Sequence, residues 1–372
     1  PAQLMNALES LHGPLTDRKT IDRIARGVTR LHHGLTQERE TFTQTRYMEE
    51  PEVRFAYGTY FLCAQAPKLA PILDRIYPRA HSPSELKILE LGSGPGTGLA
   101  GLVPWAEERT VKLDYRATDY SKAALKDASR LAKCLGQSIH TDTLDLERPI
   151  RSQLNDKSKY DLVLAMNVFN ELSDEGLEQI QTSLEGILSP DGHLLFIEPA
   201  AKAPSRKILE LRDRFLEKDW RMILPCTHSA PCPALSKAED WCHETWAFDR
   251  PEFMAQVDQR VGTRRETLKA TWFVLGLPGK PVQNVPQSPA RARAVSELFA
   301  EKGRVRIHAC SAGELLILEL QKRDRSPNNE ALMNASRFSL LEFGGAQIVG
   351  DALRLLPKSV CRELEEPDEP AQ

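Results

Sequence analysis

The first 80 residues have the hydrophobic spacing of α-helices. Between Leu4 and Ile76, apolar residues recur at intervals of three and four positions, with arginines among them. This spacing puts the apolar side chains on one face of each helix. The pattern stops at a polar, proline-containing stretch, 79–85. We therefore predict an N-terminal helical section, residues 1–80.

Short apolar runs alternate with helical stretches between residues 81 and 222. The clearest helix is expected at Asp174–Leu188, because Ser173 can cap its start and the turn Ser189–Gly192 can end it. Strands separated by helices at this spacing are typical of a parallel sheet covered on both faces. The sequence therefore predicts an α/β fold with its core at 81–222. The core strands are expected at 87–91, 112–118, 138–141, 160–166 and 193–198.

A cysteine-rich stretch follows one further helix, which is expected at Ser205–Trp220. We assign 223–266 to a cysteine-rich, metal-binding insertion and 267–325 to the last strands of the core. Residues 326–372 form a C-terminal extension, and a small β section is expected towards this end of the chain. The late strands are expected at 268–275, 305–310 and 314–320, with a Pro/Gly-rich link at 277–289 and a disordered acidic tail at Glu363–Gln372.

A glycine-rich turn, Leu89-Glu-Leu-Gly-Ser-Gly-Pro-Gly-Thr-Gly98, follows the first predicted strand and opens a helix. Glycines let a ligand approach the backbone closely, and the helix start offers unpaired N–H groups. A dinucleotide-binding fingerprint would need a third glycine at one of two positions that are occupied by Thr97 and Leu99. A formal match that starts at Gly96 lies too far beyond the strand to form the turn.

The turn resembles the first motif of class I S-adenosylmethionine-dependent methyltransferases, an acidic residue at the strand end followed by Gly-x-Gly-x-Gly. The resemblance implies that the loop wraps the amino-acid part of the cofactor. It also implies that an aspartate ending the second strand accepts hydrogen bonds from the ribose hydroxyls. Asp142 or Asp145 would then meet the adenine amino group. The cofactor-binding residues implied are Glu90, Gly92, Gly94, Gly96, Asp119, Asp142 and Asn167.

The catalytic residues are left open by the sequence, because methyl transfer can rest largely on proximity and orientation. Residues 167–172 follow the fourth strand and lack the Asp/Asn-Pro-Pro-Tyr/Phe motif typical of enzymes that methylate amino groups of nucleic acids. No cysteine stands after the fourth or fifth strand to form a covalent pyrimidine adduct. Asn167, Asn170 and Glu171 are the candidates on the acceptor side, with a capping or turn role as the alternative.

The composition, 41% hydrophobic and 27% charged, is that of a soluble globular protein. No apolar run approaches the roughly 20 residues that cross a bilayer, and no secretory signal is visible. We expect a cytoplasmic protein without membrane association, or a mitochondrial matrix protein if a presequence has been removed. The net charge is -3, but residues 201–330 carry 22 Lys and Arg against 17 Asp and Glu. This section suits either a phosphate-rich partner or a solvated surface.

Three of the seven cysteines crowd together as C-x5-C-x9-C. Structural zinc sites favour cysteine pairs two to four residues apart, so the looser spacing favours an iron–sulfur cluster, with zinc as the alternative. Buried or free thiols remain a third interpretation. The candidate metal ligands are Cys226, Cys232, Cys242 and Cys310, with His228 and His243 in reserve.

The glycine loop, the Cys-Pro cluster, Asp240-Trp-Cys-His243 and the late Cys310 together resemble the mitochondrial small-ribosomal-subunit methyltransferase-like family and its bacterial relatives. The resemblance covers roughly 45–355. It implies an S-adenosylmethionine pocket, a [4Fe–4S] site on the four cysteines, and association with the small ribosomal subunit or its rRNA. One departure is Glu244, which follows His243 where an aromatic residue is expected.

Three functions compete on this evidence. The leading prediction is a methyltransferase-like protein that acts on or docks to small-subunit rRNA during ribosome assembly or translation. The second is a non-catalytic assembly factor that keeps the fold and the cluster for docking. The third is a small-molecule methyltransferase, in which the basic section and the cysteines would have no evident use. The oligomeric state is open, with a monomer as the default.

Overall fold

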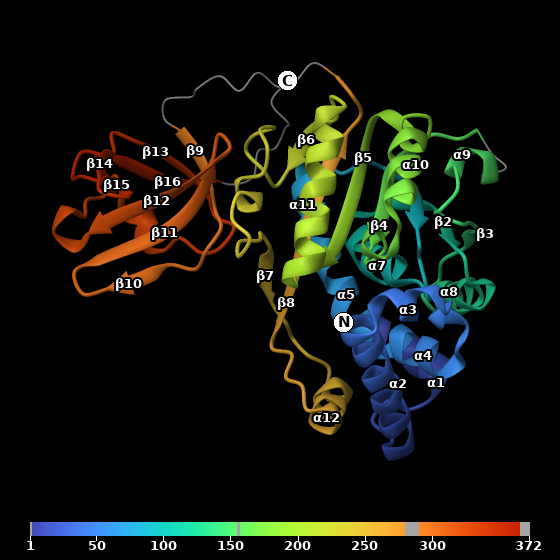
Figure 1. Ribbon diagram of the computed structural model, residues 1–372. Helices are drawn as coiled ribbons and strands as arrows, with labels where there is room; N and C mark the ends of the chain where they lie inside the picture. Colours follow the sequence, from blue (N-terminus) through green and yellow to red (C-terminus); the bar gives the residue numbers. More distant parts are fainter. Residues whose placement is uncertain (1, 155–156, 280–289, 365–372) are drawn as a thin grey trace. The chain divides into compact units, whose positions relative to one another are not determined.

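The computed structural model describes residues 2–154, 157–279 and 290–364, and the chain divides into two compact units (Figure 1). Unit 1 comprises Pro1–Phe196 and Trp246–Leu268, and unit 2 comprises Ile197–Thr245 and Lys269–Gln372. Most of the predicted link at 277–289 and most of the predicted disordered tail lie outside the described residues. The two units are described separately below.

Unit 1 begins with the predicted helical section, which is confirmed. Asp17 caps its longest helix by accepting hydrogen bonds from the backbone N–H groups of Lys19 and Thr20, and the apolar face of that helix is buried. The elements are α1 (Ala2–His12), α2 (Arg18–Gln37), α3 (Arg39–Gln44), η1 (Tyr47–Glu49), α4 (Pro51–Ala56), the π-helical turn η2 (Tyr57–Phe61), α5 (Leu62–Gln65), η3 (Ala66–Lys68), α6 (Leu69–Ile76) and η4 (Arg79–His81).

The first sheet is eight-stranded, and five of its strands follow one another in the order β3-β2-β1-β4-β5. The pairs β1–β2, β1–β4 and β2–β3 are parallel, as the alternation of strands and helices predicts. The strands are β1 (Glu85–Leu91), β2 (Lys112–Asp119), β3 (Ile139–Thr143), β4 (Tyr160–Met166) and β5 (Leu188–Pro199). The other elements are α7 (Thr97–Arg109), α8 (Lys122–Cys134), α9 (Ile150–Gln153), η5 (Phe169–Glu171), α10 (Asp174–Leu184) and α12 (Glu252–Val261).

The end of one predicted helix is wrong. Ser173 does cap α10, but the helix ends at Leu184, and Leu188 already begins β5. The backbone N–H of Tyr160 donates to the carbonyl of Ile187 at 3.0 Å, so the chain is engaged in pairing before the predicted turn. Residues 189–192 therefore lie within the strand, because partners distant in sequence outweigh their local turn preference.

Unit 2 contains the cysteine-rich stretch and the strands next to it. Helix α11 begins at Lys202, three residues before the predicted Ser205. Pro204 lies in the first turn of this helix, where a missing N–H costs little. Strand β6 pairs antiparallel with β8, and β7 also pairs with β8. These elements are α11 (Lys202–Glu217), β6 (Arg221–Leu224), η6 (Pro233–Leu235), β7 (Glu244–Ala247) and β8 (Thr267–Gly276).

A second sheet occupies the rest of unit 2, in the order β14-β15-β12-β11-β9-β13-β16, with β10 beside β11. It corrects the assignment of 305–310 and 314–320 to the core: these residues lie in β11 and β12, which pair with each other and not with β8. The strands are β9 (Ala290–Ala294), β10 (Phe299–Glu301), β11 (Arg304–Ser311), β12 (Glu314–Gln321), β13 (Leu340–Gly344), β14 (Gln347–Val349), β15 (Ala352–Leu355) and β16 (Val360–Leu364), with η7 (Lys322–Asp324) and η8 (Glu330–Met333) between them.

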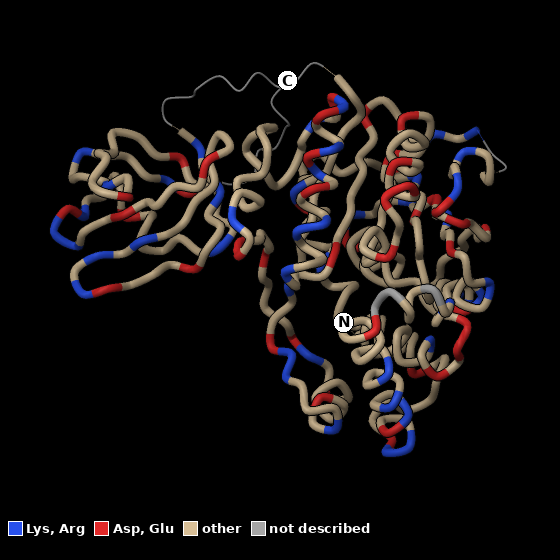
Figure 2. Tube along the Cα trace, in the orientation of Figure 1, with Lys and Arg blue, Asp and Glu red and all other residues tan. Residues whose placement is uncertain are grey.

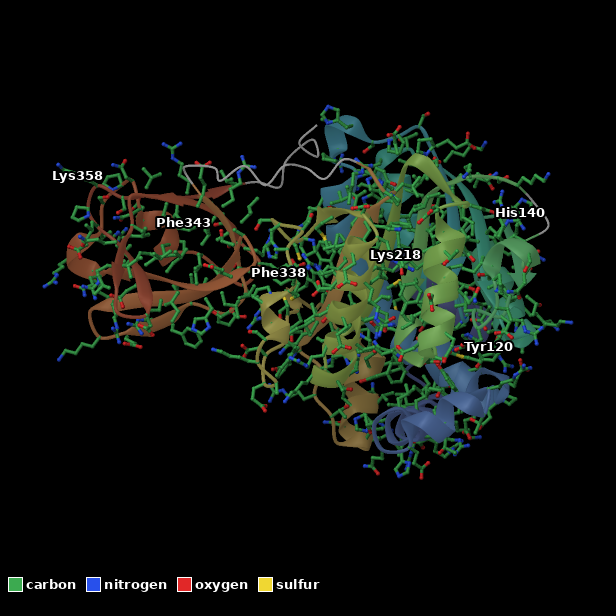
Figure 3. All side chains as sticks on the ribbon, turned by 45° about the horizontal axis from the view of Figure 1, so that its top comes forward. Tyr120, His140, Lys218, Phe338, Phe343 and Lys358 are labelled. Atoms are coloured by element: carbon green, nitrogen blue, oxygen red, sulfur yellow. The ribbon has the colours of Figure 1, made fainter. Side chains whose placement is uncertain are left out.

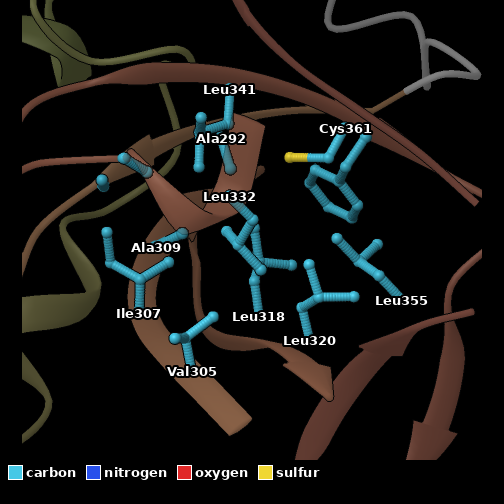
Figure 4. Close-up of a cluster of buried hydrophobic side chains, with 13 residues drawn as sticks. Ala292, Val305, Ile307, Ala309, Leu318, Leu320, Leu332, Leu341, Leu355 and Cys361 are labelled. Carbon is cyan, nitrogen blue, oxygen red and sulfur yellow. The ribbon is translucent and has the colours of Figure 1, made fainter. Parts of the chain in front are cut away.

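The second sheet encloses its own hydrophobic core (Figure 4). Ile307, Leu318, Leu341 and Leu355 come from four different strands and are all fully buried. The predicted C-terminal extension at 326–372 supplies half of these strands, so it belongs to a packed β structure. The expected small β section is thus present and larger than the sequence suggested.

Candidate functional site

The glycine loop joins β1 to α7 in unit 1. Gly92, Gly94 and Gly96 all have positive φ angles, of 64°, 52° and 101°. A Cβ added at Gly92 would lie 2.5 Å from Cγ2 of Val168, so this position cannot take a side chain without a shift of its neighbour. The sequence therefore forms the tight turn that the methyltransferase-like motif predicts.

Glu90 holds this turn against the helix that follows. Its side chain is almost completely buried, with Oε1 accepting a hydrogen bond from the Gly98 N–H at 2.9 Å and Oε2 accepting one from the Tyr115 hydroxyl. Burial raises the pKa of Glu90 to about 8, although both hydrogen bonds oppose the shift. A direct contact between Glu90 and a cofactor stays a prediction.

Asp119 ends β2 and reaches the glycine loop. Its Oδ2 accepts a hydrogen bond from the Gly94 N–H at 2.8 Å, and its Oδ1 accepts one from the Ser121 N–H at 2.8 Å. Burial raises the pKa of Asp119 to about 6, with the backbone hydrogen bonds opposing the rise. The carboxylate is therefore ionised at neutral pH. The structure thus brings together Asp119 and the loop, which the resemblance to methyltransferases places in one site.

Asn167 follows β4 with a φ of 57°, a left-handed conformation that Asn adopts more readily than most residues. Both polar atoms of its amide are buried, and neither has a hydrogen-bond partner within the described residues. A buried polar group left unpaired costs roughly 1–3 kcal/mol. The donor and acceptor of Asn167 therefore fit a polar ligand beside the loop.

The remaining predicted residues of this site have other partners. Asp142 lies in β3 and forms an ion pair with Arg116 of β2, so its contact with adenine stays a prediction. Asp145, the alternative, accepts the Glu147 N–H at 3.0 Å. Asn170 is buried in η5.

The N-terminal helical section contributes residues to this site that the sequence did not single out. A Cβ at Gly94 would meet Cε of Met48 at 3.8 Å and Cε1 of Tyr57 at 4.0 Å. The Tyr47 hydroxyl donates to Oε1 of Glu171, a candidate catalytic residue, at 2.8 Å. Tyr120, labelled in Figure 3, accepts the Met48 N–H at 3.4 Å. No local motif marks these residues, because their role depends on long-range packing.

A cavity of about 130 Å³ in unit 2 is lined by all four predicted metal ligands, Cys226, Cys232, Cys242 and Cys310. Burial raises the pKa of the Cys232 thiol to about 12, and the electrostatic interaction with nearby Cys226 adds to the shift. Burial also raises the pKa of Cys310, where Cys226 and Cys232 contribute. The fold therefore gathers cysteines that are up to 84 positions apart, from Cys226 to Cys310.

Helix α11 holds the backbone around these cysteines. The fully buried guanidinium of Arg212 donates to the carbonyls of Ala230, at 2.7 Å, and His228, at 2.9 Å. Oδ2 of Asp213 accepts the Cys232 N–H at 2.9 Å. These contacts fix the path of the cysteine-rich stretch independently of any bound group.

The two histidines that are further candidate metal ligands, His228 and His243, differ in position. Nε2 of His228 lies 3.2 Å from Sγ of Cys310, and His228 lines the cavity. His243 is not among the lining residues. Burial lowers the pKa of each histidine to about 4, so both rings are neutral at pH 7 and retain a nitrogen lone pair.

Within the described ranges, no group of three or more His, Cys, Asp or Glu side chains is arranged to hold a metal ion. A single zinc ion would draw its thiolates to about 2.3 Å from one point, whereas a [4Fe–4S] cluster is held by four thiolates. The metal-binding assignment and its ligand set stay a prediction.

Basic residues of the section 201–330 are mixed with acidic ones in the folded chain (Figure 2). Arg260 pairs with Asp22, and Arg264 pairs with Glu266. Arg306 donates to the fully buried carboxylate of Glu319. These cations are therefore partly neutralised. Each helix in the described part of the chain is too short or too polar to cross a lipid bilayer.

The chain is similar to several known proteins. It is 22% identical over 274 residues to "Reducing polyketide synthase Preu2" of Preussia isomera, a match covering 69% of this chain and 11% of that protein. The chain thus spans about a tenth of this curated relative, and less of the next ones. It is 14% identical to TehB from Haemophilus influenzae, with a TM-score of 0.35 and coverage of 56% and 62%. For the ribosomal protein L11 methylase from Lactobacillus delbrueckii subsp. bulgaricus, the identity is 15%, the TM-score 0.35 and the coverage 57% and 79%.

One family model, described as "Mitochondrial small ribosomal subunit Rsm22", matches residues 51–328, which is about three quarters of the chain. The match includes the glycine loop, Asp119, Asn167 and the four clustered cysteines. It extends over parts of both units. This agrees with the resemblance found in the sequence. The protein therefore belongs to the Rsm22 family.

Proposed function

We propose that the protein binds S-adenosylmethionine at the glycine loop of unit 1 and methylates small-subunit rRNA. The observation that carries the cofactor assignment is the buried amide of Asn167, whose two polar atoms have no partner among the described residues. The Asp119 carboxylate touches the same loop from the neighbouring strand, at Gly94. The family description supports a role at the small ribosomal subunit.

When bound, the cofactor supplies an electrophilic methyl group on its sulfonium. The chain's own residues would orient the two reactants. Asp119 would accept hydrogen bonds from the ribose hydroxyls, the loop would lie against the amino-acid part, and Asn167 would donate and accept beside them. The N-terminal residues Met48 and Tyr57 would exclude water from the loop. Orientation of this kind can supply much of the rate enhancement in a methyl transfer.

A non-catalytic assembly factor is the second candidate. One observation favours it: residues 167–172, which follow β4, lack the Asp/Asn-Pro-Pro-Tyr/Phe motif of enzymes that methylate amino groups of nucleic acids. A small-molecule methyltransferase remains the third candidate. Both leading candidates predict a protein that associates with small-subunit particles.

An assay with tritiated S-adenosylmethionine separates these functions. Purified protein is incubated with small-subunit assembly intermediates, and label in the rRNA is measured together with co-sedimentation. Label that disappears in an Asp119→Ala variant supports the methyltransferase. Co-sedimentation without label supports the assembly factor, and the absence of both contradicts a ribosomal role.

We also propose that Cys226, Cys232, Cys242 and Cys310 hold one [4Fe–4S] cluster, with zinc as the alternative. The support is that all four line a single cavity and that Arg212 and Asp213 fix the surrounding backbone. The cluster would cross-link β11 to the cysteine-rich stretch within unit 2.

The family description names a mitochondrial ribosomal subunit, which supports a mitochondrial location over a cytoplasmic one, with the matrix as the expected compartment. A monomer remains the default oligomeric state. Imaging of the tagged protein and sedimentation of the purified protein test these two points separately.

A further inference from the structure

A second cavity in unit 1, of about 240 Å³, lies among the N-terminal helices, α8 and the glycine loop. It is separate from the cysteine cavity, which lies in unit 2. Five of its lining residues carry titratable or charged side chains and come from four helices: His12 of α1, Arg23 of α2, Arg54 of α4, and Asp127 and Arg130 of α8. The lining residues are Leu8, Leu11, His12, Arg23, Pro51, Arg54, Phe55, Gly58, Pro95, Asp127, Arg130 and Leu131.

The cavity has an excess of positive charge. Three arginines face one carboxylate, that of Asp127. Arg54 is committed to that carboxylate, since its Nε lies 2.8 Å from Oδ2, and its Nη1 donates to the Met48 carbonyl at 2.7 Å. With the histidine neutral, the lining carries a net charge of about +2.

Two guanidinium groups keep donors for a ligand. Arg23 has no ion pair within the described residues, and its Cζ lies 4.0 Å from the ring centroid of Phe55. Arg130 is half-exposed, and its Nη1 is 3.7 Å from Oδ1 of Asp127, beyond ordinary hydrogen-bond distance. The two arginines come from different helices, α2 and α8, and reach one cavity.

His12 adds a neutral polar group. Its ring meets the Phe55 ring edge-on, with centroids 5.0 Å apart. Burial lowers the pKa of His12, and Arg130 and Arg23 lower it further, while Asp127 opposes them. The ring is therefore neutral at pH 7 and can donate one hydrogen bond without adding charge.

We propose that this cavity binds a phosphate monoester. A monoester carries about -1.5 to -2 charges at pH 7, which matches the lining, whereas a single carboxylate would leave a surplus positive charge. Guanidinium groups bind phosphate oxygens through paired, charge-assisted hydrogen bonds. The apolar wall, which includes Leu8, Leu11 and Leu131, would contact the organic part of the ligand.

The cavity lies next to the glycine loop. Pro95 lines the cavity and stands between Gly94 and Gly96, and a Cβ at Gly58 would lie 3.2 Å from Cβ of Pro95. A phosphate bound here would therefore lie behind the glycine loop, on the side formed by the N-terminal helices. Phosphate binding at this cavity would require neither methyl transfer nor the cysteines.

Isothermal titration calorimetry of the full chain tests the proposal with four probes: inorganic phosphate, AMP, and one short RNA carrying either a 5′-phosphate or a 5′-hydroxyl. We expect one saturable binding event per chain. Binding of AMP and phosphate assigns a free phosphorylated molecule, and binding of the 5′-phosphate RNA over its 5′-hydroxyl form assigns an RNA end. Absence of saturable binding for every probe overturns the proposal.

Variants locate the binding. Arg23→Gln with Arg130→Gln should weaken it by at least about tenfold, because two charge-assisted contacts are lost. The matched control is Arg18→Gln with Lys19→Gln, which removes the same charge from α2 outside the cavity and should change the affinity by less than about twofold. Equal weakening in both double variants would mean non-specific attraction and would overturn the site. Leu11→Trp, which fills the cavity without changing its charge, should also abolish binding; normal binding by this variant contradicts the proposal even if the arginine variant fails to fold.

Discussion

At the scale of single residues, the candidate cofactor site rests on groups whose burial would be unfavourable without a partner. A carboxylate offers about four acceptor positions, and backbone donors occupy only part of that capacity in Asp119. Asn167 keeps its whole amide unpaired within the described residues. Asp119 ends β2 and Asn167 follows β4, and these two strands flank β1 in the sheet. Open α/β sheets bind ligands at the carboxyl ends of their strands.

Replacing Asp119 by Ala should weaken S-adenosylmethionine binding by on the order of tenfold or more, because hydrogen bonds to a charged group are worth about 1.5–3 kcal/mol. Gly94→Val should also weaken binding, since a branched side chain would stand at a φ of 52° and crowd Met48 and Tyr57 beside the loop. Calorimetry measures both. Asp114→Ala is the control, because this residue lies on the same strand in a partly exposed pair with Lys87. Unchanged affinity in both test variants would refute the cofactor site.

The raised pKa of Glu90 predicts that the stability of the protein depends on pH. Its pKa is about 8 in the folded protein, against an ordinary value of 4.5, because of burial. The folded state therefore keeps a proton that the unfolded state has lost, and stability falls as the pH rises from about 4.5 towards 8. Urea unfolding at a series of pH values should show a smaller fall in Glu90→Gln, which cannot ionise. An identical slope in the two proteins would show that Glu90 does not titrate in this way.

At the scale of elements, helix α11, strands β8 and β11 and the cysteine-rich stretch all contribute to the lining of the cysteine cavity. Arg206 also supports it, since its Nη1 donates to the Lys237 and Asp240 carbonyls, each at 2.8 Å. The Thr271 hydroxyl of β8 donates to the Cys242 carbonyl at 2.8 Å. Side chains thus satisfy the backbone of a stretch that has little regular structure of its own.

Protein prepared without oxygen should contain about four irons per chain if the four cysteines hold one [4Fe–4S] cluster. Serine in place of Cys226, Cys232, Cys242 or Cys310 should lower both the iron content and the thermal stability, because metal binding is linked to folding. Metal analysis and calorimetric melting provide the measurements.

Two controls sharpen this experiment. Cys134 is exposed and Cys63 is buried, and both lie outside the cavity, so their serine variants should keep the wild-type iron content. One zinc per chain without iron would support the alternative metal. Equal iron loss in the control variants would contradict the assigned ligands.

At the scale of the whole molecule, the family match extends over parts of both units, so the two candidate sites occur within one family region. The net charge of -3 gives no uniform attraction to RNA. Several arginines of the basic section are paired with carboxylates. Binding to RNA would require phosphates to compete with these partners.

We nevertheless expect small-subunit binding to pass through the basic section and to weaken steeply with salt, because each neutralised phosphate releases counterions. Changing six residues to Gln should lower the affinity and flatten the salt slope by about one unit for each lost phosphate contact. The six are Arg260, Arg264, Arg265, Lys269, Arg304 and Arg306. Co-sedimentation over a range of salt concentrations measures both effects. Wild-type affinity and slope in this variant would direct the search to the N-terminal helices.

The sequence by itself determined the features that depend on neighbouring residues. The glycine turn after β1, the acidic residue at the end of β2 and the strand β4 lie where the pattern predicted them. These features follow from periodicity and from the backbone preferences of Gly and Asp, which act over a few residues. The N-terminal helices are also local in origin, because their apolar spacing alone defines their buried faces.

Only the tertiary structure decided which distant residues meet. The pairing of β11 and β12 within a second sheet, the contact of Tyr47 with Glu171 and the gathering of Cys310 with Cys226 all join separated segments. The early end of α10 has the same cause, since the backbone at Ile187 pairs with Tyr160 instead of continuing the helix. Such contacts are selected by the burial of whole faces and by the satisfaction of backbone hydrogen bonds, which no short stretch of sequence specifies.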